Sequence, residues 1–309
     1  MIQTNLEKSL NIILPNTNKA LKTVLQESSK SDLQQLTQHK DLNSILNSLL
    51  KQSATDSSQD KLLLSLLKNN PTLKNLGNTS STLKELLHAL SLEKPSFTLE
   101  KNLTKYIGDI KDISEKNLKN KIENSGLFLE NKLKNIGKQT HLKELFSQDF
   151  KLLLHQAEKE LSASSSPQKQ ELLKHIEKLS LQLDYHQLLS HLSNATSLYI
   201  PYSWDALEDG NITIKNVENE KFFTDINLKL KEYGEIRLRL GIFEKNQLSI
   251  NITTQNEDLK SMIKSSLPIL KKQLFNAGII PKSIKFIDEK KNIYETVESV
   301  IAIGFEVKA

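Results

Sequence analysis

The chain has 309 residues, with 42 basic and 37 acidic side chains and no cysteine. The lack of cysteine excludes disulfides, thiolate chemistry and cysteine-based zinc sites, and no apolar run is long enough to span a membrane as a helix. The formal net charge is +5, and this excess lies in residues 1–198, where it is too dispersed to form a patch for a polyanion. Arg237 and Arg239 are the only arginines. This argues against a nucleic-acid partner, because arginine is the side chain most used to bind guanine and phosphate.

Residues 1–60 are rich in Asn, Ser, Thr, Gln and Lys, with scattered Leu. Weak helices are predicted at 2–14, 17–28 and 41–52, followed by a Ser-rich linker. Short helices without a packing partner are marginal in water. The composition therefore predicts a flexible N-terminal segment over 1–60.

Residues 61–196 predict a Leu-rich helical region. Two short helices, at 61–69 and 81–92, are separated by Asn70-Pro71 and Gly77, and Ser80 or Ser81 suits the N-cap of the second. A longer helical pattern over 99–135 is weakened at Gly108 and at Ser125-Gly126.

Two clearer apolar stripes follow, over 141–161 and 167–183, and a Ser-rich loop joins them. Pro167 fits the first turn of the second helix. Two helices joined in this way predict an antiparallel helical hairpin that packs within the chain. The stripe residues are Leu142, Phe146, Phe150, Leu153, Ala157 and Leu161, then Leu172, Ile176, Leu179 and Leu183.

Strand-like alternation begins after residue 197 and predicts a small α+β domain over 197–309. A first strand is expected at 211–217, and three further runs have apolar residues at every second position, which marks strands with one buried face. Turns are predicted at 232–234 and 244–246. The alternating residues are Ile226, Leu228, Leu230, Ile236, Leu238, Leu240, Leu248, Ile250 and Ile252.

Helical spacing from Leu259 to Leu274 follows the strands. Gly278 is expected to end this helix, because glycine takes positive φ without strain, and residues 284–287 predict a return strand. Pro268 interrupts the pattern, so either the helix kinks or two helices meet near residues 265–266. Beyond residue 292, the apolar residues at 297, 300, 301 and 303 fit a strand or a short helix equally well. The fold class is therefore α+β: a helical, partly disordered N-terminal region followed by a β-meander and helix domain.

No catalytic motif occurs in the sequence. The phosphate-loop patterns, the HExxH pattern and the Gly-x-Ser-x-Gly elbow are absent. His186 and His191 are five positions apart, which places their rings about 140° apart on a helix and prevents them from sharing a metal ion. Asp205, Glu208 and Asp209 fit a solvated turn. We therefore predict a protein that is not an enzyme and has no cofactor.

Two segments of the C-terminal domain carry a family resemblance. The helix end SLPILKKQLFNAGI (266–279) and the turn LKLKEYGEIRLRL (228–240) resemble the C-terminal domain of the flagellar hook-length control protein family. The resemblance covers 222–287, and IENSGLFLENKL (122–133) loosely resembles a segment in the middle of such proteins. The turn departs from the family pattern, since Tyr233 stands where Leu is usual before Gly234 and a lysine replaces the usual proline.

The resemblance implies a non-enzymatic protein that starts in the cytoplasm and is exported through the flagellar type III apparatus to the hook and the cell exterior. Its C-terminal domain would bind the cytoplasmic domain of the export gate protein and switch export from hook to filament subunits. The N-terminal region would contact hook or hook-cap subunits, and no membrane insertion is expected. The alternatives are a cytoplasmic helical scaffold or adaptor and, ranked lower, a nucleic-acid-binding protein.

The motif residues are the candidates for partner binding, although core packing competes with this role for the apolar ones. They are Leu230, Tyr233, Gly234, Ile236, Leu238, Leu240, Leu267, Pro268, Leu270, Leu274 and Gly278.

Overall fold

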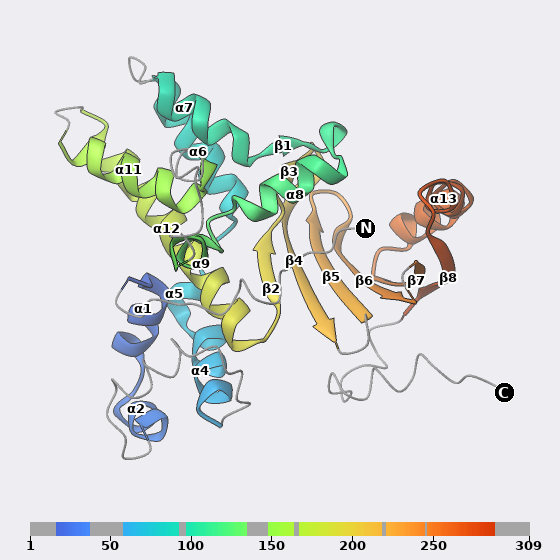
Figure 1. Cartoon of the computed structure of the whole chain (residues 1–309), viewed down its shortest axis with the longest axis horizontal. Helices are drawn as coiled ribbons and strands as arrows, with labels where there is room; N and C mark the ends of the chain where they lie inside the picture. The colour runs from blue at the N-terminus through green and yellow to red at the C-terminus, as the bar shows by residue number, and fades with distance from the viewer. Residues whose placement is uncertain are drawn as a thin grey trace. The chain divides into compact units, whose positions relative to one another are not determined.

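The computed structural model of the chain describes residues 17–37, 58–92, 97–134, 148–163, 167–217, 221–244 and 246–287. Helices predominate as far as residue 192 and strands prevail after it, so the predicted α+β class is confirmed (Figure 1). The chain divides into two compact units, Met1–Asn216 and Val217–Ala309. The proposed division into independent domains at residues 60 and 196 stays a prediction.

Helix α12 (Lys169–Leu192) is the central element of the first unit. It passes through both hydrophobic cores of that unit, and it packs on helices from both of them. The first core also contains residues of α6 (Thr79–Leu92), α7 (Phe97–Leu103) and α11 (Phe150–Ser162). The second contains residues of α1 (Lys19–Glu27), α2 (Lys30–Thr37), α4 (Ser58–Asn69) and α5 (Pro71–Lys74).

The predicted helical hairpin is confirmed as α11 and α12, which pack against each other. The predicted stripes supply its interface, because the α11 residues Phe150, Leu153 and Ala157 are buried. All four predicted α12 stripe residues, from Leu172 to Leu183, are buried in the same core. The predicted stripe positions 142 and 146 lie outside the described residues.

The helix predicted at 17–28 is confirmed as α1, while those predicted at 2–14 and 41–52 lie outside the described residues. Asn18 caps α1, since its Oδ1 accepts a hydrogen bond from the Leu21 N–H at 2.8 Å. Ala20, Leu21 and Val24 are buried in the second core. Residues 17–37 are thus more ordered than the flexible segment expected from composition, because α12 provides the packing partner that a short helix needs.

The helical pattern of 99–135 breaks at both of its weak points. At the first, Gly108 lies in a two-residue strand, β1 (Gly108–Asp109), which pairs in parallel with β3 (Tyr202–Ser203). At the second, Gly126 has φ +90°, and an added Cβ there would lie 2.9 Å from the Lys151 backbone nitrogen. The chain therefore forms two short helices on either side of this glycine, α8 (Glu115–Glu123) and α9 (Leu129–Lys134).

Helices α4 and α6 match the two Leu-rich helices predicted from the sequence. The predicted N-cap of the second helix is wrong. The helix begins at Thr79, and the Asn78 Oδ1 accepts a hydrogen bond from the Ser80 N–H at 2.7 Å. Asparagine caps a helix as well as serine does, so residue type alone could not identify Asn78, in preference to Ser80 or Ser81, as the cap.

A buried ionic cluster joins four helices of the first unit. The Lys151 Nζ of α11 lies 2.6 Å from the Glu130 Oε1 of α9 and 2.8 Å from the Asp184 Oδ1 of α12. The Asp184 Oδ2 also accepts a hydrogen bond from the Lys19 N–H at 2.6 Å, which fastens the start of α1 to α12. Burial alone would lower the pKa of Lys151, but the two carboxylates outweigh burial and raise its pKa.

Two strands complete the first unit. Strand β2 (Thr196–Tyr199) pairs antiparallel with β4 (Leu207–Val217), and β2 packs on α12. The strand predicted at 211–217 lies within β4.

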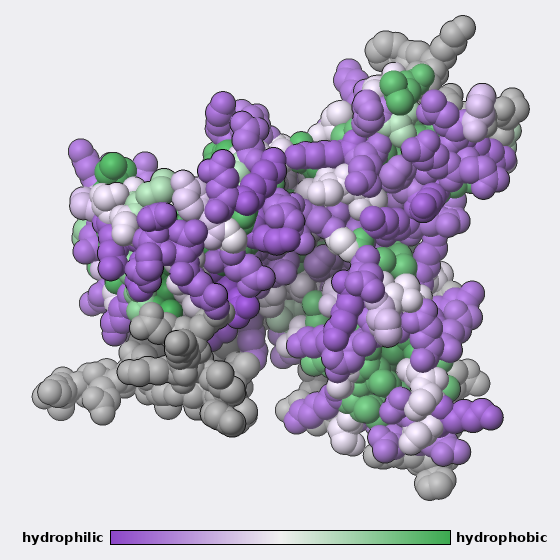
Figure 2. Space-filling view, turned by 180° about the vertical axis from the view of Figure 1, so that it is seen from behind, coloured by the Kyte–Doolittle hydropathy of each residue, from purple (hydrophilic) through white to green (hydrophobic). Residues whose placement is uncertain are grey.

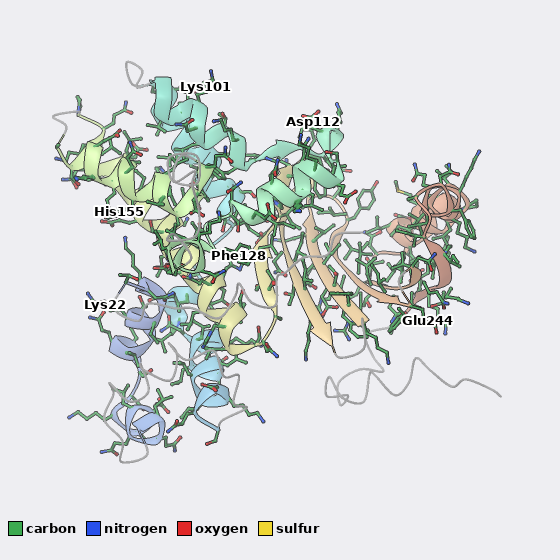
Figure 3. The ribbon with its side chains drawn as sticks, in the orientation of Figure 1. Lys22, Lys101, Asp112, Phe128, His155 and Glu244 are labelled. Carbon is green, nitrogen blue, oxygen red and sulfur yellow. The ribbon has the colours of Figure 1, made fainter. Side chains whose placement is uncertain are left out.

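Four strands form the sheet of the second unit, in the order β5, β6, β7, β8. Strands β5 (Lys221–Leu230), β6 (Gly234–Phe243) and β7 (Gln247–Thr254) form an antiparallel meander. Glu244 has φ +47° in the turn after β6 (Figure 3). Helix α13 (Glu257–Asn276) then crosses over to β8 (Ile280–Phe286), which lies parallel to β7.

Helix α13 is continuous through Pro268, so the predicted meeting of two helices near residues 265–266 is wrong. Proline removes one backbone donor and clashes with the preceding turn. Here it lies on the exposed side of the helix. The hydroxyls of Ser265 and Ser266 both donate hydrogen bonds to the Met262 carbonyl in the preceding turn.

From the buried ionic cluster we predict that substitution of Asp184 lowers the free energy of unfolding. The Asp184→Ala variant leaves the Lys151 ammonium with one carboxylate fewer in a buried site, and this should cost about 3–5 kcal/mol of unfolding free energy. Urea denaturation measures the loss. The control is Glu123→Ala, which removes an exposed pair with Lys119 and should cost about 0.5 kcal/mol or less. Equal effects of the two substitutions would contradict the structural role of the cluster.

Candidate partner-binding surface

The strand register places the apolar residues of the second unit on one face of its sheet. Leu238 is central to this arrangement, since it pairs with Ile226 on β5 and with Ile252 on β7. Ile250 pairs in turn with Ile284 on β8. Because side chains alternate between the faces of a strand, these pairs share one face, and the predicted one-sided burial is confirmed.

Only part of this apolar face is fully buried. The buried core consists of Ile236, Leu248, Ile250, Ile252 and Leu259. Helix α13 packs chiefly on β7 and β8 (Figure 1). Among the apolar residues that β5 and β6 place on this face, Ile236 is buried. The half-buried ones are Ile226, Leu228, Leu230, Leu238, Leu240 and Ile242.

The polar face of the sheet contains both arginines. The Arg239 Nε donates to the Asp225 Oδ1 at 2.6 Å and its Nη2 to the Asp225 Oδ2 at 3.3 Å, across directly paired positions. Arg237 lies 3.2 Å from Glu235. Opposite charges across a strand pair stabilise the sheet. Because these arginines are paired with carboxylates of the same unit, the pairing favours a solvated face over a binding surface for an acidic partner.

A hollow of about 530 Å³ lies at the turn between β5 and β6. Gly234 begins β6 with φ +73°, and no heavy atom lies within 4 Å of the position of an added Cβ. The hollow is mainly polar and also borders the N-terminus of α13. Its lining residues are Tyr233, Gly234, Glu235, Arg237, Thr253, Thr254, Gln255 and Asn256.

The outer surface of α13 exposes large apolar side chains. Met262 is 52% exposed and Ile269 is 63% exposed. They are seven positions apart, so they lie two turns apart on the same side of the helix. Most of the visible surface is hydrophilic, with small hydrophobic patches (Figure 2). Exposed apolar residues on one side of a helix provide contact area for a partner.

The predicted site residues fall into three groups. Ile236 is in the core, and Leu230, Tyr233, Leu238, Leu240, Leu270 and Leu274 pack around it. Leu267 is half-buried without belonging to this core. Pro268, Gly234 and Gly278 are exposed, and both glycines have positive φ. The structure thus brings all of them into one unit, and their role in binding stays a prediction.

Sequence reasoning missed Met262 and Ile269. The apolar stripe from Leu259 to Leu274 identifies the inward side of α13, and residues off the stripe were not considered. The available signal was two large apolar residues seven positions apart, both off the inward stripe of the helix.

The histidines on α12 have environments that suit packing. Burial lowers the pKa of His186 to about 4, so that its imidazole is neutral at physiological pH. Its Nδ1 lies 3.4 Å from the Ser197 Oγ. Within the described ranges, no group of three His, Asp or Glu side chains is placed to hold a metal ion. No helix in the same ranges has the length and apolar character of a membrane span.

Residues 211–293 match the model of a protein family described as flagellar hook-length control protein FliK. This match extends from within β4 through β8, and it confirms the resemblance for that segment. A search of curated proteins and a search of solved structures found no match to the chain.

The turn at Gly234 generates a prediction about the backbone. Gly234→Ala should cost about 1 kcal/mol of unfolding free energy, because a Cβ disfavours positive φ. Since the added methyl group meets no neighbour, this cost comes from backbone conformation alone. Gly234→Asn should cost less, because asparagine tolerates this conformation better than alanine does. Urea denaturation measures both, and an alanine variant as stable as the wild type would show that the turn does not require positive φ.

Proposed function

We propose that this protein is a non-enzymatic flagellar hook-length control protein. It leaves the cytoplasm through the flagellar type III export apparatus. Its second unit binds the cytoplasmic domain of the export gate and thereby switches export from hook to filament subunits. The observation that carries the proposal is the family match over residues 211–293, which contains all the described strands and the helix of the second unit.

The geometry of the second unit supports a binding role. The exposed pair Met262 and Ile269 on α13 provides apolar anchors, and the half-buried side chains of β5 and β6 adjoin the core. Apolar anchors surrounded by polar residues are typical of the centre of a protein interface. The backbone of α13 is fixed by its packing on β7 and β8, so the anchors are held in place before binding.

We assign contact with hook or hook-cap subunits to the first unit. This assignment follows from the family resemblance. The described helices of this unit pack around α12 in two cores. The same compact packing favours a second candidate function, a cytoplasmic scaffold or adaptor. Detection of the protein outside the cell during hook assembly supports hook-length control, and strict retention in the cytoplasm supports the scaffold.

Deletion of the gene tests the proposed function in the cell. A strain without the protein should assemble abnormally long hooks that lack filaments, because export would not switch to filament subunits. Electron microscopy of isolated flagella measures hook length and the presence of filament. Expression of the wild-type gene in the deleted strain is the control. Normal hooks with filaments in the deleted strain would reject the proposal.

A substitution on α13 tests the proposed gate contact. Ile269→Asp places a charge on an exposed apolar anchor and should weaken binding to the purified cytoplasmic domain of the gate by about tenfold or more, or about 1.4 kcal/mol. Ser261→Asp introduces the same charge at an exposed position about 80–100° around the helix from Ile269 and Met262 and should have a smaller effect. Isothermal titration calorimetry measures both affinities, and circular dichroism checks that both variants fold. Equal affinity of both variants and the wild type would exclude this side of α13 from the contact.

A further inference from the structure

One side of helix α13 carries two lysines and a phenylalanine in a row. Lys264 and Lys271 are seven positions apart, and Phe275 follows four positions later. At about 100° per residue, the three side chains lie within about 40° of one another around the helix. All three are exposed, and Phe275 is exposed to 59%. We call these three residues the lysine flank.

The lysine flank lies on the side of α13 that faces β8. The Lys264 Nζ is 5.6 Å from the centroid of the Phe286 ring on β8, and a cation in this position is attracted to the ring. Met262 and Ile269 lie about 160° from the lysines around the helix, so they belong to its opposite side. The lysine flank is therefore a second surface, separate from the one proposed for the gate.

The stretch around the lysine flank carries charge of one sign. Residues 259–287 are all described, and they contain six lysines and no aspartate or glutamate. Lys260 lies beside the flank, and its Nζ is 3.2 Å from the Oε1 of Glu257, which precedes this stretch. A field of one sign attracts side chains of the opposite sign and repels a second copy that carries the same lysines. Charge complementarity therefore favours an acidic partner.

A protein helix fits the lysine flank better than an anionic membrane does. A helix binds a membrane surface through a broad apolar face, and the broad apolar stripe of α13 is already packed on β7 and β8. On the flank itself, Phe275 is the exposed apolar residue. One aromatic anchor beside charged groups is typical of a contact between proteins, but it offers little apolar area to a membrane.

We propose that the lysine flank binds an acidic amphipathic helix of a protein partner. Lys264 and Lys271 are about 10.5 Å apart along the axis, because a helix rises about 1.5 Å per residue. A partner helix that lies alongside α13 meets both ammonium groups when its acidic residues are seven positions apart, and an apolar residue of the same face packs on Phe275. Charge pairs of this kind guide association and fix the register. This inference does not depend on the proposed function.

Two labelled helical peptides test the proposal against the full-length protein. Both have the same leucines, and at every seventh position one has glutamate where the other has glutamine. Fluorescence anisotropy measures their affinities. The glutamate peptide should bind about tenfold more tightly, or better, at low salt, and added salt should reduce this difference because it screens the charges. Equal affinity of the two peptides would overturn the proposal.

A double charge reversal tests whether the flank itself is the contact. Lys264→Glu combined with Lys271→Glu should lower the affinity for the glutamate peptide about tenfold or more, because two attractions become repulsions. The matched control is Lys221→Glu combined with Lys231→Glu, which changes the net charge equally at exposed positions of β5 and the turn after it. The control should lower the affinity about threefold or less. Circular dichroism checks folding, and equal losses would show that net charge, not the flank, attracts the peptide.

Nuclear magnetic resonance of the wild-type protein locates the contact without a substitution. On addition of the glutamate peptide, the amide signals of Lys264, Lys271 and Phe275 should shift more than those of Met262 and Ile269. The reverse order would place the peptide on the other side of α13 and overturn the proposal. Vesicles of phosphatidylglycerol and a short DNA duplex are the competing probes. If either binds more tightly than the glutamate peptide, and loses affinity in the lysine variant, the flank belongs to a membrane or a nucleic acid and the proposal fails.

Discussion

The structure of the second unit depends on one constraint: its sheet has a single apolar face, and one helix covers only part of it. The register from Ile226 to Ile284 puts every alternating apolar residue on this face. Helix α13 has 20 residues and is therefore about 30 Å long. It lies mainly along β7 and β8, and full burial is confined to β7, Ile236 of β6 and Leu259 of α13, while the other apolar residues on this face stay half-buried or exposed. The apolar surface that remains is consistent with a binding module.

The first unit buries its apolar residues around one shared helix. Helix α12 presents Leu172 and Ile176 to one core and Leu188 to another, so one long helix serves two cores. The ionic cluster around Lys151 lies between the helices of this unit and fixes how α1 meets α12. A buried charge tolerates only an arrangement in which its partners are present. The cluster therefore selects one packing of α1, where leucine contacts alone would accept several.

Periodicity predicted the elements whose burial follows a simple pattern. Alternation located β5, β6 and β7, and the 3.6-residue stripe located α11, α12 and α13. Periodicity did not predict elements that depend on a contact with a residue far away in the sequence, or on pairing that continues beyond the apolar pattern. The order of α1 depends on Asp184, more than 160 residues away, and composition alone suggested a flexible segment. Strand β8 begins at Ile280, earlier than predicted, because its pairing with β7 continues through the irregularity beside Pro281.

For the candidate site, the resemblance identified residues that mainly form the scaffold. Leu230, Leu238 and Leu270 match the motif because they pack around the core, and a substitution there changes folding before it changes binding. The motif residues thus identify the architecture, and the contacts proposed for a partner lie at positions between them. Ile269 illustrates this, since it is exposed between Leu267 and Leu270. A surface of this kind can vary with its partner while the scaffold stays the same. Recognition of the domain from sequence is therefore easier than recognition of its contact residues.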